Sequence, residues 1–299
     1  YWIANWTHLN NTRENPDANF KLIADLNDST TGYAEVVDNS KKGFKPIGTA
    51  AEEASVIYSF TGRFDGGGHT ISDLRINRSS TNSVGLFGSI DDKAVVENIG
   101  VKNGTIKGRS DVGALVGNLD GQSVVRDSYA TATVKGVSGR GVGGLVGLDG
   151  GGEIVGSYAT GNVTGDQFVG GLVGHKFAGK VENSYATGKV TGDVYVGGLF
   201  GRLEGSVSDS YAAGNVTGST GSDFVGGLAG EAADAAIGGS YWDINRTTQL
   251  DSSGDAIGLT TSEMTGAGAL DVGNMTLDDT GDDPTWETVT QETPGADAD

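Results

Sequence analysis

The sequence has 299 residues, of which 52 are glycine, 4 are proline and none is cysteine. Without cysteine neither a disulfide framework nor a thiolate metal site is available, so stability must come from packing and backbone hydrogen bonds. The formal net charge of -19 argues against nucleic acid as a partner, because phosphate contacts need clustered Lys and Arg. Abundant glycine with little proline excludes a collagen-like chain and is typical of short strands joined by tight turns.

The acidic charge is concentrated near the C-terminus. Residues 231–299 hold 15 Asp and Glu against one base, a net of -14, which leaves 24 acids and 19 bases, a net of -5, for residues 1–230. Abundant Asp with few Lys suits a halophilic archaeon, but its concentration in one segment weakens that interpretation. No apolar run is long enough to span a bilayer, and the sequence begins at Tyr1 without a signal-like segment, so we expect a soluble piece of a longer protein.

Residues 1–60 precede the repeats and are predicted to form an N-terminal cap. Trp2, Trp6 and Leu9 at roughly helical spacing predict a short helix, and Phe20–Leu26 predicts a strand. A cap is needed because the first coil of a repeat stack otherwise exposes an apolar end and unpaired strand edges. The segment after it, Phe60–Asn77, predicts strand, glycine turn and strand, and so begins the stack.

Two sequence blocks recur with one period between residues 61 and 241. The first resembles Val-Gly-Gly-Leu-Val-Gly, and its leading valines are separated by 28, 30, 27, 27 and 29 residues: Val84, Val112, Val142, Val169, Val196 and Val225. The second is Ser-Tyr, at Tyr129, Tyr158, Tyr185, Tyr211 and Tyr241. Self-similarity at about 28 residues indicates a repeat architecture.

The repeated units predict an all-β fold, a parallel β-helix or β-solenoid. Each unit holds short apolar segments broken by Gly, Asn or Asp, and none is long enough for a helix. Such a unit cannot bury its apolar side alone, so like positions must stack in columns about 4.8 Å apart. One apolar position supports this, since it always lies three residues before the Ser of Ser-Tyr: Val125, Ile154, Val181, Val207 and Ile237.

Side-chain alternation predicts where the tyrosines point. In Ser-Tyr-Ala-Thr the small Ser and Ala share one face of the strand and Tyr the other, and a narrow interior accepts the small residues more easily. We therefore expect an outward, stacked aromatic ladder that could bind sugar rings or a flat partner, formed by Tyr129, Tyr158, Tyr185 and Tyr211. Two alternatives stay open: a bend after Ser would turn the tyrosines inward, and the stacking could be purely structural.

Residues 242–299 follow the last repeat and are predicted to form a C-terminal cap that continues into an acidic linker or tail. Within them, Asp278–Asp283 offers closely spaced oxygen ligands, but it lacks the EF-hand spacing and its bidentate Glu. A solvated linker is therefore the default interpretation, and Ca²⁺ binding is the alternative. No other cofactor is expected.

The repeats resemble the GLUG-motif repeats of microbial cell-surface proteins. The matching residues are Val169–Gly174, Asn183–Gly188 and Asn162–Gly165, and Phe60–Ile71 resembles the stretch that usually precedes such repeats. The resemblance covers about two thirds of the chain. It implies a right-handed parallel β-helix, found in adhesins and in non-catalytic regions of secreted peptidases, and it supplies no catalytic residues.

The residues themselves predict no catalytic site. Asp127, Asn183 and Asp209 share one turn position that Gly156 and Gly239 interrupt, so a turn role explains them better than paired catalytic carboxylates. The three histidines lie in unlike segments without metal-ligand spacing: His8, His69 and His175. The glycine blocks lack the lysine of a P-loop, and close coil packing explains them better. We expect no metal site and no enzyme.

Asn-X-Ser/Thr sequons exceed the number that chance predicts, which is about three from the counts of Asn, Ser and Thr. There are nine, two of them inside the repeat block: Asn5, Asn10, Asn27, Asn77, Asn103, Asn162, Asn215, Asn245 and Asn274. Glycosylation at some of these sites would require an exported protein.

The leading hypothesis is therefore an extracellular cell-surface β-solenoid, adhesin-like or a spacer, with surface glycans, proteins or other domains of the same protein as partners. A non-catalytic segment of a large secreted hydrolase or peptidase is the second hypothesis. A polysaccharide lyase is a third, which would need a groove with several carboxylates beside Lys or Arg.

Overall fold

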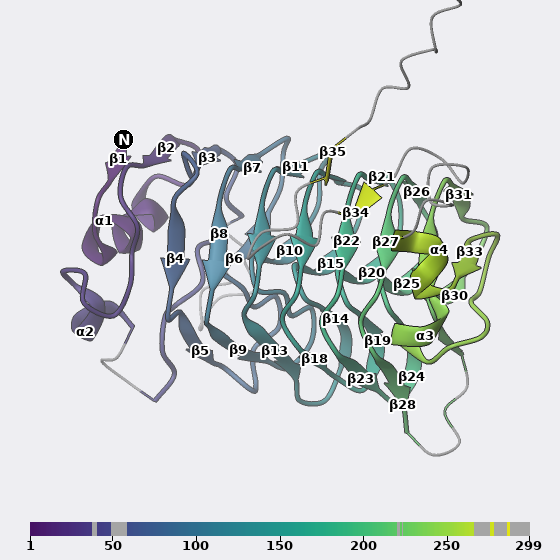
Figure 1. Ribbon diagram of the computed structural model, residues 1–299. Helices are drawn as coiled ribbons and strands as arrows, with labels where there is room; N and C mark the ends of the chain where they lie inside the picture. Colours follow the sequence, from purple (N-terminus) through teal and green to yellow (C-terminus); the bar gives the residue numbers. More distant parts are fainter. Residues whose placement is uncertain are drawn as a thin grey trace, which may run out of the picture.

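The computed structural model shows a parallel β-solenoid whose coils stack from the N-terminal to the C-terminal end, with helices α1 and α2 at one end and α3 and α4 at the other (Figure 1). The structure describes residues 1–37, 41–48, 59–219, 222, 224–265, 276–277 and 286–287. Among these residues no helix is long and apolar enough to cross a membrane. The predicted all-β parallel solenoid is thus confirmed.

The helices are short and lie at the ends: α1 Trp6–Asn11, a 3₁₀ helix Thr12–Glu14, α2 Tyr33–Val36, α3 Ile244–Thr247 and α4 Thr261–Thr265. A nine-stranded sheet runs the length of the solenoid: β1 Trp2–Ile3, β2 Asn19–Leu22, β3 Arg63–Asp65, β7 Val95–Glu97, β11 Val124–Arg126, β16 Glu153–Val155, β21 Lys180–Glu182, β26 Ser206–Ser208 and β31 Ala236–Gly238. Next around each coil comes the tyrosine sheet: β4 Thr70–Ser72, β8 Gly100–Lys102, β12 Tyr129–Ala130, β17 Tyr158–Ala159, β22 Tyr185–Ala186, β27 Tyr211–Ala212, β32 Tyr241–Asp243 and β33 Ile257–Leu259.

Three further sheets complete the coils. The first is six-stranded: β5 Arg75–Asn77, β9 Thr105–Gly108, β13 Thr133–Gly136, β18 Val163–Thr164, β23 Val190–Gly192 and β28 Val216–Gly218. The four-stranded sheet comprises β14 Arg140–Gly143, β19 Gln167–Gly170, β24 Val194–Gly197 and β29 Val225–Gly226. The β6–β30 sheet comprises β6 Phe87–Ile90, β10 Val116–Leu119, β15 Val146–Asp149, β20 Val173–Lys176, β25 Phe200–Leu203 and β30 Ala229–Ala232. A separate antiparallel pair is β34 Thr276–Leu277 and β35 Trp286–Glu287.

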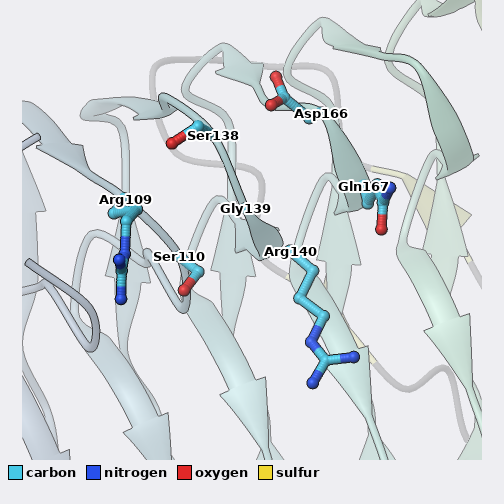
Figure 2. Close-up of a pocket in the computed structure, with 7 residues that line it drawn as sticks. All are labelled: Arg109, Ser110, Ser138, Gly139, Arg140, Asp166 and Gln167. Carbon is cyan, nitrogen blue, oxygen red and sulfur yellow. The ribbon is translucent and has the colours of Figure 1, made fainter. Parts of the chain in front are cut away.

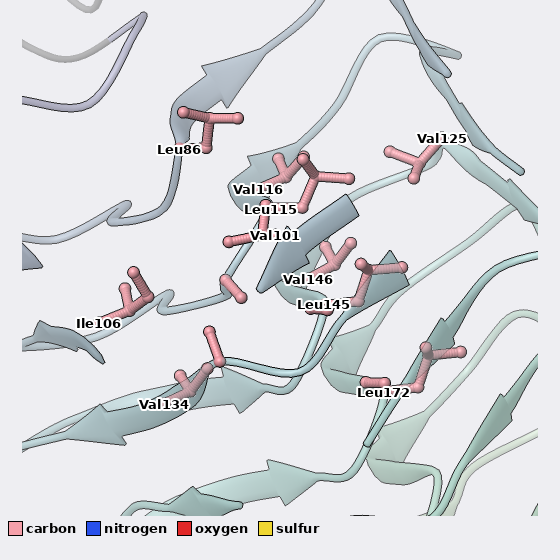
Figure 3. Close-up of a cluster of buried hydrophobic side chains, with 14 of the residues drawn as sticks. Leu86, Val101, Ile106, Leu115, Val116, Val125, Val134, Leu145, Val146 and Leu172 are labelled. Carbon is pink, nitrogen blue, oxygen red and sulfur yellow. The ribbon is translucent and has the colours of Figure 1, made fainter. Parts of the chain in front are cut away.

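Like positions of successive coils stack into apolar columns inside the solenoid. The predicted column is in register across the nine-stranded sheet, since Val125 pairs with Ile154, and the pairing continues through Val181 and Val207 to Ile237. The first four of these are buried. Figure 3 shows leucines of three coils, Leu115, Leu145 and Leu172, among this buried cluster. The interior is therefore a continuous apolar stack, as the repeat period predicts.

The glycines of the Val-Gly-Gly-Leu-Val-Gly block allow two stretches of backbone to approach each other. A Cβ at Gly170 would lie 2.0 Å from the carbonyl oxygen of Val173, and one at Gly174 would lie 2.2 Å from the backbone nitrogen of Val142. Real side chains do not tolerate such distances, so only glycine fits there. Close packing of the coils explains the block, as expected.

A left-handed turn and a serine close each corner between the nine-stranded sheet and the tyrosine sheet. Asp127, Asn183 and Asp209 each have φ of 49°, a conformation that Asn and Asp adopt more readily than most residues. The buried serine that follows donates its hydroxyl to the carbonyl two residues earlier, as Ser184 does to Glu182 at 2.8 Å. Ser184 Oγ also accepts the backbone N–H of Ser157 at 3.2 Å. Asp127, Asn183 and Asp209 therefore form turns, as the sequence predicts.

The N-terminal segment continues the solenoid's own sheet. β1 pairs with β2 and β2 with β3, all parallel, so the nine-stranded sheet crosses residue 60 without a break. The expected helix is shorter than its apolar spacing suggested, because Trp2 lies in β1 and the helix begins at Trp6. Asn5 caps α1 by accepting the backbone N–H of His8 at 2.8 Å. Helix α1 thus covers the first coil with the buried Trp6 and Leu9.

At the other end the solenoid is closed by α3, β33 and α4. Asp243 caps α3, because its side chain accepts the backbone N–H groups of Asn245 and Arg246 at 2.9 and 3.0 Å. β33 adds to the tyrosine sheet by pairing with β32. The acidic run 278–283 proposed as a Ca²⁺ ligand and most of the predicted tail lie outside the described residues.

Candidate functional site

The tyrosines of the tyrosine sheet form a stacked row on the outside of the strands. Ring centroids are 4.8 Å apart for Tyr129 and Tyr158, 4.7 Å for Tyr158 and Tyr185, and 5.0 Å for Tyr185 and Tyr211, with interplanar angles of 6°, 4° and 14°. The alternating small residues face the interior, since Ala130, Ala159, Ala186 and Ala212 belong to the apolar core and the row does not. The stacking follows from the alternation and register of the sequence.

The tyrosine row is covered at its C-terminal end. Tyr185 and Tyr211 are only 1% and 2% exposed, and they form a separate buried cluster with Tyr241 and with Met264 of α4. Burial raises the pKa of Tyr211 above its ordinary value. The open aromatic strip expected from the sequence is therefore absent at these two positions. Because neighbouring rings also cover each other's faces, little ring face is left on which a sugar could stack.

A second aromatic row lies at the corner before the last three Val-Gly-Gly blocks. Phe168, Tyr195 and Phe224 directly precede the valines of three successive coils, and their ring centroids are 5.1 and 4.8 Å apart. This corner row becomes more open along the axis, since Phe168 is 6% exposed and Phe224 is 53% exposed. Phe177, 45% exposed, extends the surface. The sequence did not reveal this row.

The corner row holds bulky residues in a backbone conformation that suits glycine. Phe168, Tyr195 and Phe224 have φ of 52°, 58° and 64°, where earlier coils place Asp111 and Gly141. A positive φ is a genuine outlier for a bulky residue and costs of order 1–3 kcal/mol. Such strain persists where surrounding structure imposes it and is frequent at functional surfaces.

Charged side chains border the corner row. The His175 ring packs against Phe168 and Phe177, with centroids 4.7 and 3.8 Å away, and its Nε2 lies 3.0 Å from Glu204 Oε1. Burial lowers the pKa of His175, while Glu204 opposes that shift. Arg202 lies over the Phe168 ring at 5.8 Å and pairs with both Glu204 and Glu231. The row therefore combines aromatic rings with hydrogen-bonding groups.

A pocket of about 520 Å³ lies at the same kind of corner in the preceding coils, lined by Arg109, Ser110, Ser138, Gly139, Arg140, Asp166 and Gln167. It coincides with the 30-residue spacing between Val112 and Val142, the longest in the array. Figure 2 shows Arg109 and Arg140 extending to the same side of the ribbon. Arg109 Nε donates to Asn82 Oδ1 at 2.8 Å. The lining therefore combines two guanidinium groups and one carboxylate with hydroxyl and amide groups.

Asp111 lies beside this pocket and titrates unusually. Burial raises its pKa to about 6, although the charges of Arg140 and Arg109 act in the opposite direction. A raised carboxyl pKa is typical of acid or base groups in active sites. Within the described residues, however, no group of three or more His, Asp or Glu could hold a metal ion.

The remaining predicted residues lie apart from each other. His8 lies in α1, and His69 follows the glycine turn after β3, with Nδ1 3.3 Å from Asp25 Oδ1. Four sequon asparagines are exposed: Asn77, Asn103, Asn162 and Asn245. Four others are partly buried: Asn5, Asn10, Asn27 and Asn215. Asn274 lies outside the described residues. No finding tests glycosylation, which stays a prediction.

The family profile of the GLUG motif matches residues 108–135 and 169–191. The chain carries GLUG-motif repeats. The second matched region begins at Val169, the first residue of the Val-Gly-Gly block, and ends in β23. The resemblance seen in the sequence is thereby confirmed, and the matched residues are those that build the stacked coils.

Two relatives match the chain over part of their length. Halomucin of Haloquadratum walsbyi is 37% identical over 145 residues, 48% of this chain and 2% of halomucin. A protein of Evansella cellulosilytica described provisionally as a Gly-rich membrane protein is 34% identical over 123 residues, 40% of this chain and 13% of that protein. This chain thus matches only a small part of each.

The fold also resembles that of a solved protein. A crystal structure from Bacteroides ovatus, described provisionally as an immunoglobulin A1 protease, superposes with a TM-score of 0.72 at 20% identity. The match covers 88% of this chain and 85% of that one. At this identity the likeness establishes the shared β-solenoid fold alone.

Proposed function

We propose that this chain is a non-catalytic module of an extracellular cell-surface protein, a spacer with an adhesin-like contact surface. The observation that carries the proposal is the unbroken solenoid of GLUG repeats, whose side chains are used to stack one coil on the next. The nine-stranded sheet runs from β1 to β31 without interruption. A rod of this kind separates what is attached to its two ends.

The relatives support a surface location. Halomucin and the Gly-rich membrane protein are both matched over a small share of their length, 2% and 13%. A repeat segment within long proteins suits a spacer, because such a segment adds length without adding chemistry. The predicted sequons agree with an exported chain, and we propose glycans at the exposed Asn77, Asn103, Asn162 and Asn245. Mass spectrometry of the native protein with no glycan at any of these would contradict that part.

The corner row is the contact surface that we propose for surface glycans. Tyr195 is partly exposed and Phe224 largely exposed, whereas Phe168, Tyr185 and Tyr211 are buried. Aromatic rings bordered by carboxylate and imidazole groups suit sugars, which present apolar ring faces and hydroxyls together. The tyrosine row, in this proposal, stabilises the stack of coils and binds no ligand.

A non-catalytic segment of a larger secreted hydrolase is the second candidate. The shared fold with the Bacteroides ovatus protein favours it, since that structure is described as a protease. The two candidates place the solenoid in the same compartment and differ in what the neighbouring domains do.

Antibody labelling of intact cells tests the location. Antibodies raised against the purified solenoid are expected to label unpermeabilised cells of the source organism, and mild protease treatment of those cells should remove the signal. Labelling that requires permeabilisation would contradict a surface module. A matched antibody against a cytoplasmic protein controls for cell lysis.

A further inference from the structure

One position inside the β6–β30 sheet departs from the apolar pattern in two neighbouring coils. The last residues of the strands are in register and are apolar in four coils: Ile90, Leu119, Leu203 and Ala232. The first three are fully buried, and Ala232 is partly buried. In β15 and β20 the same position holds Asp149 and Lys176, which are paired in register. Both side chains are 0% exposed. A carboxyl and an amine thus face each other in the closed interior.

The two groups are held in a defined arrangement. Lys176 Nζ lies 2.5 Å from Asp149 Oδ2 and donates to the carbonyl oxygen of Gly152 at 2.7 Å. Asp149 Oδ1 accepts the backbone N–H groups of Gly151 and Gly152 at 3.2 and 2.8 Å. One carboxyl oxygen therefore lies against the amine, and the other lies between two backbone donors.

A buried ion pair at this position needs an explanation beyond stability. Removing two charges from water costs several kcal/mol for each ion, and apolar residues of similar volume often stabilise a core equally well or better. The other coils show that apolar residues fit this column. Burial also raises the pKa of Asp149 and lowers that of Lys176, although each partner's charge opposes these shifts. Both shifts increase the share of the neutral acid and the neutral amine.

We propose that Lys176 and Asp149 condense to an intramolecular isopeptide bond. The Nζ lone pair of the neutral amine attacks Cγ of the protonated carboxyl, which forms the C–N bond and a tetrahedral intermediate. The C–Oδ2 bond then breaks, and Oδ2 leaves as water with its own proton and one from Nζ. No oxidant or other reactant is needed. The backbone N–H groups of Gly151 and Gly152 stabilise the negative charge that develops on Oδ1, as an oxyanion hole does.

Proximity lowers the barrier to this condensation. The fold holds amine and acid at contact distance in an interior without bulk water, which replaces a bimolecular step by a unimolecular one. Expelled water leaves the interior and does not return to hydrolyse the amide. The product is neutral, so the cost of burying two charges disappears. The bond joins residues 27 apart in the chain and closes one whole coil into a covalent ring.

The bond would hold two coils together independently of their backbone hydrogen bonds. β15 and β20 are otherwise joined by the parallel ladder between them. A closed ring shortens the stretch of chain that tension on the ends can extend and limits the unfolded states available to that coil. The inference concerns the chain's own chemistry and does not depend on the proposed surface function.

Mass spectrometry of the full chain, produced in a host without N-glycosylation and then denatured, tests the proposal. The intact mass is expected to fall short of the sequence mass by one water molecule. Trypsin cleaves after Arg140, Lys176 and Lys180 but not after a lysine whose Nζ is acylated. A bonded chain therefore yields peptide 141–180 minus one water, with no backbone fragments from between residues 149 and 176. An unmodified chain yields peptide 141–176.

A succinimide at Asp149 and Gly150 would also remove one water, but it leaves Lys176 open to trypsin. A folded chain that has its full sequence mass, or that loses water and is still cleaved after Lys176, overturns the proposal. The double variant Lys176→Met with Asp149→Leu restores the apolar column and is expected to fold with its full sequence mass. Lys180→Arg keeps the trypsin site and should retain the loss of water, because Lys180 is an exposed residue paired with Glu182.

Discussion

The two aromatic rows of this solenoid obey the same repeat and differ in backbone conformation and in exposure. The tyrosines lie in β-strands and their rings stack with interplanar angles from 4° to 14°. At its C-terminal end the row is buried against Met264 of α4. The corner row uses left-handed backbone and ends at a ring that is 53% exposed. A periodic aromatic position therefore does not by itself mark a binding surface; backbone strain and exposure are what distinguish the corner row that we propose for binding.

The largest expected effect comes from the buried part of the tyrosine row. Tyr185→Ala removes a ring that is 1% exposed and stacked on both sides, so the free energy of unfolding should fall by about 3 kcal/mol. Chemical denaturation checks this. If Tyr185→Ala unfolds within about half a kcal/mol of the wild type, the row does not stabilise the stack.

Removing a tyrosine ring at the N-terminal end of the same row should lower the free energy of unfolding by less. Tyr129 stacks on one tyrosine and is only partly buried, so Tyr129→Ala is expected to lower the free energy of unfolding by about 1 kcal/mol. Tyr129→Phe keeps the ring and serves as the matched control. Equal losses at positions 129 and 185 would show that burial by the C-terminal helices is unimportant.

In the corner row, removing a ring is expected to leave the free energy of unfolding unchanged or to increase it. Phe224→Gly removes a largely exposed ring and relieves a φ of 64°, so the chain should be as stable as the wild type or more stable by about 1 kcal/mol. Phe224→Ala keeps the strain and is expected to be the less stable of the two variants. Thermal unfolding of both compares them directly. A large loss in Phe224→Gly would mean that the corner row is structural after all.

A further expected effect, on the pH dependence of stability, concerns Asp111 beside the pocket. Burial raises the pKa of Asp111 to about 6 in the folded chain from 3.8 in the unfolded chain. The folded state therefore binds the proton more tightly, and folding gains stability as the pH falls from above 6 towards 4. Asp111→Asn carries no charge, so it should unfold with a higher free energy than the wild type at pH 7. This difference in the free energy of unfolding should shrink by pH 4, where Asp111 of the folded wild type is protonated. A difference that stays constant with pH would contradict the raised pKa.

The sequence predicts the scaffold well because a repeat imposes its period on every column. The spacing of the valines and of Ser-Tyr indicated parallel coils, and the position three residues before Ser was correctly placed inside. The cap was harder to predict, because β1 and β2 carry no repeat block and yet join the nine-stranded sheet.

The burial and backbone conformation of the two aromatic rows were less visible in the sequence. Local preference does not suggest that Phe168 or Tyr195 adopts a left-handed backbone, since bulky residues avoid it. The burial of Tyr185 depends on α4, which lies outside the repeat. A signal for the buried pair was present, because aligned strand ends read Leu119, Asp149, Lys176 and Leu203. It becomes informative only once the register shows that this column faces inward.

The most direct test of the difference between the rows is binding of the full chain to a glycan array and to cells. The double variant Tyr195→Gly with Phe224→Gly is compared with Tyr129→Ala, each confirmed to be folded. We expect the wild type to bind and the Tyr129 variant to bind with the same affinity. The corner variant is expected to bind at least tenfold more weakly, a loss of about 1.4 kcal/mol of binding free energy. Binding that survives in the corner variant, or a wild type that binds nothing, would contradict the corner row as a contact surface.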